Sequence, residues 1–165
     1  MITELFGTYI LMFVGCGAAL VDREKTLTII GIAMVWGLAL MAVIYAVGHI
    51  SDAHLNPTVT IAFAAACRFP LIQSKGFSGV AIGVTLLFNV IIAGPITGAS
   101  MNPARSIGPA VVSGAYRNIW VFVVSPILGA MAAAMIYSLL RPSKTQKNQE
   151  SSKSIYNDLY LHSNA

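Results

Sequence analysis

Charged residues are scarce in this sequence. Only 10% of its 165 residues are Asp, Glu, Lys or Arg, whereas 56% are apolar. Water-soluble domains have about 25% charged residues, because their surfaces face water. The mean hydropathy of +0.75 points in the same direction. The composition therefore favours a chain that lies largely within a lipid bilayer over the alternative of a soluble protein with an α-helical core.

Cysteine is also scarce, and the groups that catalysis needs are not clustered. The two cysteines, Cys16 and Cys67, fall in or near apolar stretches, so the sequence offers no disulfide framework. It contains no nucleophile–base pair, phosphate-binding loop or set of metal ligands. Its basic residues are not interleaved with aromatic ones, as a nucleic-acid surface would require. We therefore expect neither an enzyme nor a cofactor, a metal or a nucleic-acid partner.

Four apolar stretches are long enough to cross a membrane, which takes about 20 residues per helix. They cover residues 2–21, 27–48, 79–98 and 118–140. The first is not a typical signal peptide, because it has no basic start, carries an acidic residue and lacks a small-residue cleavage site. The sequence thus predicts an all-α, multi-pass integral membrane domain over residues 1–140.

The basic residues predict how the chain is oriented. Arg68 and Lys75 lie between the second and third stretches and several lysines follow the fourth, whereas the loop at residues 22–26 is neutral. Because Lys and Arg favour the cytoplasmic side, the middle connection and the C-terminus are expected there. Residues 141–165 are dominated by Ser, Lys, Gln and Asn, which is typical of a disordered tail. The plasma membrane and an internal membrane fit this pattern equally.

A short motif occurs twice, as Asn56-Pro57-Thr58 and Asn102-Pro103-Ala104. The copies lie 46 residues apart, and the same offset aligns further identical or similar residues. These pairs are Gly37 with Gly83, Leu40 with Leu86, Gly48 with Gly94, Ile50 with Ile96, Ala53 with Ala99, Thr60 with Ser106, Ile61 with Ile107 and Ala64 with Ala110. A match of this kind indicates an internal duplication, which is common in transport proteins.

Each motif opens a helix that is too short to cross the membrane. Residues 56–66 and 102–113 supply about 11 helical residues each, or roughly 16 Å, half of a hydrocarbon core. Asn is a favourable N-cap, and Pro suits the first helical position because its missing N–H would have no partner there. The non-helical segment before each motif has to line a cavity or lie buried in protein.

The predicted topology places the first half-helix on the cytoplasmic side and the second on the outer side. If both fold inward, their N-termini meet near the midplane, and two positive dipole ends face one aqueous path. Such a path accepts neutral solutes that form hydrogen bonds and opposes cations and protons. Each Asn can cap its helix through its oxygen and offer its amide protons to a passing oxygen.

These residues resemble the aquaporin (major intrinsic protein) family, and most closely its plant nodulin-like intrinsic proteins. The likeness lies in the stretches GHISDAHLNPTVTIAFA, CRFPL and NVIIAGPITGASMNPARSIGPAVV. The resemblance implies an aquaporin-like fold and a channel for passive transport of water and small neutral solutes such as glycerol. It also implies a homo- or hetero-oligomer, the family's usual tetramer.

The resemblance further implies a selectivity filter made of Trp36, Val90, Ala99 and Arg105. Arg105 directly follows the second motif, where its side chain can donate several hydrogen bonds and repel cations. Trp36 would supply a rigid apolar wall, while Val90 and Ala99 would leave space. Taken without the resemblance, Trp36 and Val90 fit a lipid-facing or core position equally well.

The sequence departs from the family pattern in its first half. The family has six full spans, whereas this chain passes from about residue 73 directly into the equivalent of the fifth, so that the third and fourth are missing. Asp52 stands where the family generally has Gly, and Thr58 replaces the motif's Ala. Two interpretations remain: a channel whose pore is completed by assembly, or a nonconducting truncated or splice-variant product that associates with full-length aquaporins.

Three polar residues near the first motif or the chain start have roles that the sequence leaves open. Glu4 either corresponds to a family glutamate that accepts hydrogen bonds from the re-entrant loop or is an interfacial residue. His49 and His54 are expected to hydrogen-bond loop backbone, because too few further ligands lie nearby for a metal site.

Overall fold

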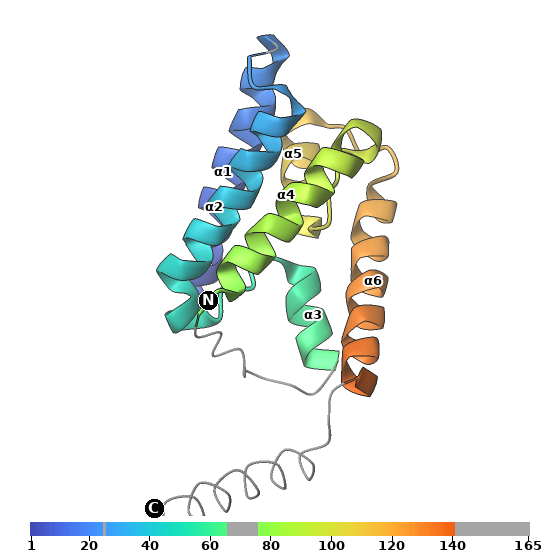
Figure 1. Ribbon diagram of the computed structural model, residues 1–165. Helices are drawn as coiled ribbons and strands as arrows, with labels where there is room; N and C mark the ends of the chain where they lie inside the picture. The colour runs from blue at the N-terminus through green and yellow to red at the C-terminus, as the bar shows by residue number, and fades with distance from the viewer. Residues whose placement is uncertain (25, 66–75, 141–165) are drawn as a thin grey trace, which may run out of the picture.

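The computed structural model describes residues 1–24, 26–65 and 76–140. All regular structure in these ranges is helical, which confirms the expected all-α class. The elements are α1 (Ile2–Val21), the short 3-10 helix η1 (Asp22–Glu24), α2 (Thr28–Ser51), α3 (Pro57–Ala65), α4 (Ser78–Thr97), α5 (Pro103–Ser113) and α6 (Ile119–Leu140) (Figure 1). The tail expected at residues 141–165 lies outside the described residues.

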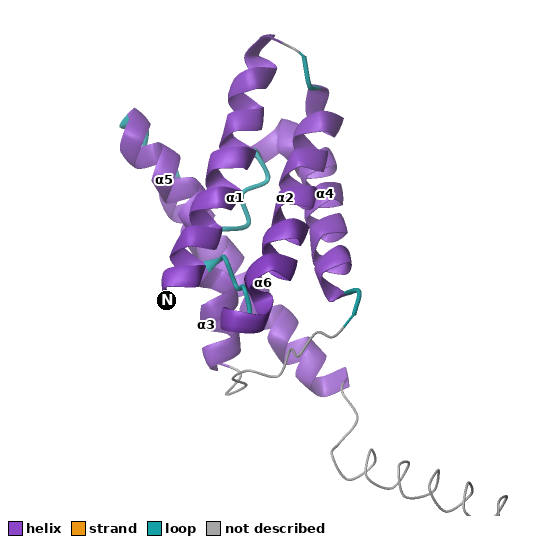
Figure 2. Cartoon of the chain, turned by 90° about the vertical axis from the view of Figure 1, so that its left-hand side faces the viewer, coloured by secondary structure: helices purple, strands orange, loops and turns teal. Residues whose placement is uncertain are grey.

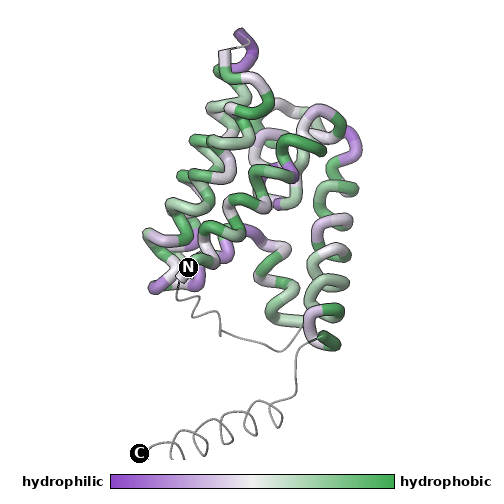
Figure 3. The backbone as a smooth tube through the Cα atoms, viewed as in Figure 1, coloured by the Kyte–Doolittle hydropathy of each residue, from purple (hydrophilic) through white to green (hydrophobic). Residues whose placement is uncertain are grey.

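Four helical segments have the length and composition of membrane spans: α1 with η1, α2, α4 and α6. Figure 3 shows how apolar they are, with hydrophilic residues mainly in the connecting segments and near helix ends. Helix α3 has 9 residues and α5 has 11, so each crosses only about half of a hydrocarbon core. Four spans with two half-helices are the architecture that the sequence predicts.

Helices α2 and α4 cross at two glycines that the duplication makes equivalent. A Cβ atom on Gly37 would lie 2.6 Å from the carbonyl oxygen of Gly83, and a Cβ atom on Gly83 would lie 2.6 Å from that of Gly37. Small residues at such a crossing let the two backbones approach closely. The reciprocal contact places a pseudo-two-fold axis between the glycines, so the sequence duplication folds as a symmetric pair of helices.

The chain leaves α2 and α4 through the same left-handed turn. Asp52 ends α2 with a φ of 62°, and its counterpart Gly98 ends α4 with a φ of 77°. Each backbone N–H donates to the carbonyl four residues earlier, at 3.0 and 2.9 Å. The next residues, Ala53 and Ala99, also have positive φ, at 47° and 50°. Because this conformation favours glycine, Asp52 carries a backbone strain that Gly98 avoids.

Helices α1 and α6 have no counterparts related by this axis. Helix α1 packs against α2, whereas α6 packs against α3 and α5 (Figures 1 and 2). By symmetry, the counterpart of α1 would precede α4 and the counterpart of α6 would follow α3. Only residues 66–77 connect α3 to α4, and one span needs about 20 residues. Within the described chain, α4 and α5 therefore each keep an apolar face uncovered.

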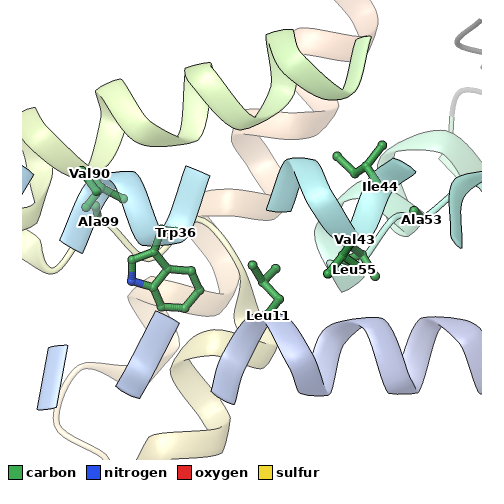
Figure 4. Close-up of a cluster of buried hydrophobic side chains, with 9 residues drawn as sticks. Leu11, Trp36, Val43, Ile44, Ala53, Leu55, Val90 and Ala99 are labelled. Atoms are coloured by element: carbon green, nitrogen blue, oxygen red, sulfur yellow. The ribbon is translucent and has the colours of Figure 1, made fainter. Parts of the chain in front are cut away.

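The core forms where the loops before α3 and α5 meet the spans. Its buried members are Leu11, Ala33, Trp36, Val43, Ile44, Ala53, Leu55, Val90 and Ala99 (Figure 4). Of these, Leu55 and Val90 are the largest side chains that are fully buried. Both loops are thus held by apolar packing at the depth where their backbone leaves the helical conformation.

Asp52→Gly is expected to stabilise the chain by about 0.5–1 kcal/mol, because glycine adopts the left-handed turn without steric strain. The measurement is the thermal unfolding midpoint in detergent micelles, followed by helical circular dichroism. Ile50→Gly, at an exposed position two residues earlier and inside α2, is the matched control and is expected to lower the midpoint. A lower midpoint for Asp52→Gly would show that the carboxylate stabilises more than the strain costs.

Candidate functional site

The two motif asparagines cap the helices that they precede. The Oδ1 atom of Asn56 accepts a hydrogen bond from the Thr58 backbone N–H at 2.9 Å, and Oδ1 of Asn102 accepts one from the Ala104 N–H at 2.9 Å. Both half-helices begin at the motif proline, whose missing N–H needs no partner at this position. The capping predicted for both motifs is therefore confirmed, and the local sequence dictates it.

The same two side chains join the loops to each other. Nδ2 of Asn56 donates to the Met101 carbonyl at 3.0 Å, and Nδ2 of Asn102 donates to the Leu55 carbonyl at 2.8 Å. Each asparagine thus bonds the residue that precedes the other asparagine. These crossed hydrogen bonds, so named below, hold the two half-helix N-termini side by side, and both positive dipole ends point into the same region. Each amide keeps one further proton for another acceptor.

A second symmetric pair of contacts holds the residues on either side of each motif. Nδ1 of His54 lies 3.0 Å from Oγ1 of Thr60, and at the equivalent positions Oγ of Ser100 lies 2.5 Å from Oγ of Ser106. The His54 ring also stacks on Phe63, with 5.2 Å between ring centroids. The expectation that the imidazole bonds loop backbone is therefore wrong for His54. Among the residues the structure describes, no group of potential metal ligands occurs.

Glu4 ties the first re-entrant loop to α1. Its carboxylate accepts hydrogen bonds from the Ser51 hydroxyl at 2.6 Å, the His54 N–H at 3.1 Å and the Leu55 N–H at 2.8 Å. Charge-assisted hydrogen bonds of this kind are stronger than neutral ones. They satisfy backbone donors that the non-helical path of the loop exposes. Of the two roles open for Glu4, the structure therefore supports the anchoring of the loop.

Arg105 anchors the second re-entrant loop and lies against Trp36. Its guanidinium donates to the Ala99 carbonyl at 2.5 Å and to the Gly98 carbonyl at 2.6 Å. The Cζ atom lies 4.1 Å from the centroid of the Trp36 ring, a cation–π geometry. The charge is thus fixed in position by two hydrogen bonds and by an aromatic face.

The structure gathers all four residues of the implied filter. Trp36, Val90 and Ala99 belong to one buried cluster and are 2%, 1% and 3% exposed (Figure 4). Arg105 joins them through its contacts with Trp36 and Ala99. Trp36 and Val90 are buried, so the lipid-facing alternative is wrong for both.

Two buried polar atoms are left without hydrogen-bond partners in the part of the chain that the structure describes. They are Nε1 of Trp36 and Oγ1 of Thr58. A buried polar group without a partner costs about 1–3 kcal/mol, so such groups commonly bind water or a ligand. Trp36 therefore offers an N–H donor as well as the expected apolar wall. The residue type alone does not reveal that this donor is left without a partner.

Gly15 of α1 determines where the Trp36 ring can lie. A Cβ atom at Gly15 would lie 2.4 to 2.5 Å from three atoms of this ring, closer than atoms can pack. The ring therefore occupies the space that the missing side chain leaves. No local pattern of residues singles out this glycine, because apolar spans commonly contain several.

The duplication has diverged at this site. The residue equivalent to Arg105 in the first repeat is Val59, and the residue equivalent to Trp36 in the second repeat is Ile82. The symmetric backbone therefore carries an arginine and an aromatic ring on one side of the crossed hydrogen bonds, and apolar residues at the equivalent positions on the other. The candidate filter comes from divergence after the duplication, since the fold itself is symmetric.

The sequence matches a known protein family. The family's sequence model, described as "Major intrinsic protein", matches residues 1–78 and 73–137. Aquaporin NIP1-1 of Zea mays is 40% identical over 208 aligned positions, which cover 85% of this chain and 74% of that protein. Nodulin-26 of Glycine max is 37% identical over 209 positions, covering 86% and 77%. Aquaporin NIP1-2 of Arabidopsis thaliana is 35% identical over 216 positions, covering 86% and 74%.

The same alignments locate a gap inside the chain. Since 85% of 165 residues is about 140 residues, about 68 of the 208 positions aligned with the maize protein face no residue of this chain. The two family matches overlap at residues 73–78, at the end of the α3–α4 connection and the first residue of α4. A gap of this length is enough for two membrane spans at about 20 residues each. It falls where symmetry places the counterparts of α1 and α6.

Gly15→Ala is expected to displace the Trp36 ring and to destabilise the chain by about 1–3 kcal/mol, as overpacking generally does. The measurement is Trp36 fluorescence in a Trp120→Phe background, which leaves one tryptophan. We expect emission at longer wavelength as the ring loses its packing. Gly17→Ala is the matched control on the same helix, because a Cβ there meets no atom within 4 Å. Equal emission and stability for both variants would contradict the assignment.

Proposed function

The chain belongs to the major intrinsic protein family of channels for water or small solutes, and we propose that it forms a passive path for water and small neutral solutes such as glycerol. Its four apolar spans identify an integral membrane protein. The observation that best supports the proposal is the pair of crossed hydrogen bonds between the motif loops, which brings two half-helix N-termini together. We assign the six motif residues, Asn56, Pro57, Thr58, Asn102, Pro103 and Ala104, to the centre of this path.

The charges around the path favour neutral solutes. Two positive dipole ends and the fixed guanidinium of Arg105 repel cations, and the protons of the Asn amides can bond a passing oxygen. A cation would exchange its hydration shell for donors only, which is unfavourable. Water and alcohols carry lone pairs and no charge, so they suit the same groups.

The proposed filter has polar donors beside apolar surface. Arg105 uses two donors on loop carbonyls, and a guanidinium has five, so others remain for a solute. Trp36 adds its indole N–H, which has no partner within the described residues. Val90 and Ala99 are apolar and small or medium in size. Glycerol has hydroxyl groups that accept hydrogen bonds and C–H groups that suit apolar contact, so it fits this combination.

The wall of the path is completed by assembly in this proposal. The uncovered faces of α4 and α5 include Ile92, Ile96, Val111 and Val112, which are 61% to 89% exposed. Lipid or further protein chains cover these surfaces, and we infer a homo- or hetero-oligomer such as the tetramer. The basic residues favour a cytoplasmic C-terminus, in the plasma membrane or an internal membrane.

A specific observation favours a second candidate function. About 68 aligned positions of the relatives have no counterpart here, and they fall where two helices would border α4 and α5. Loop carbonyls left open to hydrocarbon would each cost several kcal/mol. A nonconducting, truncated or splice-variant product that associates with full-length aquaporins is therefore the alternative.

Arg105→Trp is expected to reduce solute-driven swelling of proteoliposomes to the rate of protein-free vesicles, because the larger ring closes the proposed filter. The measurement is stopped-flow light scattering in water and glycerol gradients, with insertion confirmed in each sample. Arg117→Trp makes the same chemical change at an exposed residue before α6 and is expected to swell like the unmodified protein. Unmodified protein that inserts but swells no faster than empty vesicles would instead establish the nonconducting alternative.

A further inference from the structure

One side of α4 carries an exposed stripe of residues at regular spacing. Its members recur at alternating intervals of three and four and are defined here as the α4 stripe: Ile82, Thr85, Asn89, Ile92 and Ile96. All five are exposed, and the three isoleucines are 44%, 71% and 79% exposed. This spacing is that of helices which pair along one seam. The stripe therefore has the pattern of a helix–helix contact.

Asn89 lies at the middle of this stripe and near the middle of the span. Its side chain makes no hydrogen bond within residues 1–24, 26–65 and 76–140, whereas Thr85 satisfies its hydroxyl on the Ala81 carbonyl at 2.7 Å. A primary amide without a partner in hydrocarbon costs several kcal/mol. In membranes such side chains are commonly satisfied by a neighbouring helix. Asn89 therefore calls for a polar partner outside the described chain.

The pseudo-two-fold axis shows that this face can hold a helix. The equivalents of Ile82 and Asn89 on α2 are Trp36 and Val43. Both contact α1, because a Cβ at Gly15 would meet the Trp36 ring and a Cβ at Gly7 would lie 2.9 Å from Val43. Figure 2 shows α1, α2 and α4 in a row, with α4 at the outer end. The face of α2 that α1 covers thus has an uncovered equivalent on α4.

We propose that the α4 stripe is a homodimer contact, in which α4 pairs in parallel with α4 of a second copy of this chain. Two copies with the same orientation in a membrane are related by a two-fold axis along its normal, which places Asn89 opposite the partner's Asn89. An amide is both donor and acceptor, so the two side chains satisfy each other. A single asparagine among isoleucines at seam positions sets the register of such a pair.

The homodimer rests on the oligomer inferred above as part of the proposed function, but it does not require that the chain conduct. Cysteine cross-linking in the bilayer tests the geometry. In a background with Cys16→Ala and Cys67→Ala, Ile92→Cys places a thiol on the α4 stripe, and mild oxidation is expected to give a product of twice the 17.5 kDa chain mass. Val84→Cys is the matched control, because it is exposed on α4 but lies off the stripe.

The role of Asn89 is tested by adding substitutions to the Ile92→Cys chain. Asn89→Leu removes the hydrogen bond and is expected to weaken dimerisation roughly five- to tenfold, whereas Asn89→Gln keeps the amide and retains most of it. The dimer fraction is measured by cross-linking and by single-molecule photobleaching at several protein-to-lipid ratios. Circular dichroism and Trp36 fluorescence establish that each variant is folded.

Three outcomes would overturn the homodimer. Equal cross-linking from Val84→Cys and Ile92→Cys would mean random collision. Dimerisation that does not change in Asn89→Leu would show that the amide has no part in it. A cross-linked product of the native membrane whose mass matches only a full-length relative would identify a different occupant of the α4 stripe. Because none of these measurements uses solute flux, they are independent of whether the proposed channel conducts.

Discussion

The crossed hydrogen bonds of Asn56 and Asn102 hold the N-termini of the two half-helices together inside the fold. Each side chain caps its own half-helix and bonds the loop that leads to the other. Without them, two short helices with exposed N-terminal N–H groups would end inside hydrocarbon. Glu4 then holds the first loop by accepting hydrogen bonds from its backbone N–H groups, and Arg105 holds the second loop by donating to its backbone carbonyls. Both loops thus have backbone groups satisfied by a charged side chain.

The pseudo-two-fold symmetry explains how the two repeats pack together and which helices lack a counterpart. The close contact of Gly37 with Gly83 places the two repeats about one axis, and the crossed hydrogen bonds obey the same axis. Helices α1 and α6 lack counterparts because the connection between α3 and α4 is too short to form them. The chain therefore keeps the centre of a symmetric architecture and loses part of its periphery. The gap in the alignments with its relatives therefore falls at the lateral surfaces beside α4 and α5.

Some equivalent positions of the two repeats keep the same backbone conformation but carry different side chains. Asp52 and Gly98 both end their helices in the left-handed conformation, so the two repeats keep the same turn although the residue type differs. Val59 and Arg105 also occupy equivalent positions, yet only the arginine can anchor a loop and contact Trp36. The shared residues maintain the crossed hydrogen bonds and the α2–α4 contact, and the residues that differ make the two sides of these bonds chemically unlike.

Residue order alone specifies the spans, the half-helices and their caps. Apolar length and Asn-Pro capping act over a few residues, so their outcome does not depend on the rest of the chain. Which polar atoms form hydrogen bonds with one another depends instead on how the helices and loops pack. Glu4 bonds Leu55, His54 bonds Thr60 rather than loop backbone, and the Trp36 ring lies against Gly15. Such contacts join segments far apart in sequence or depend on side-chain direction, and residue order carries no local signal for either.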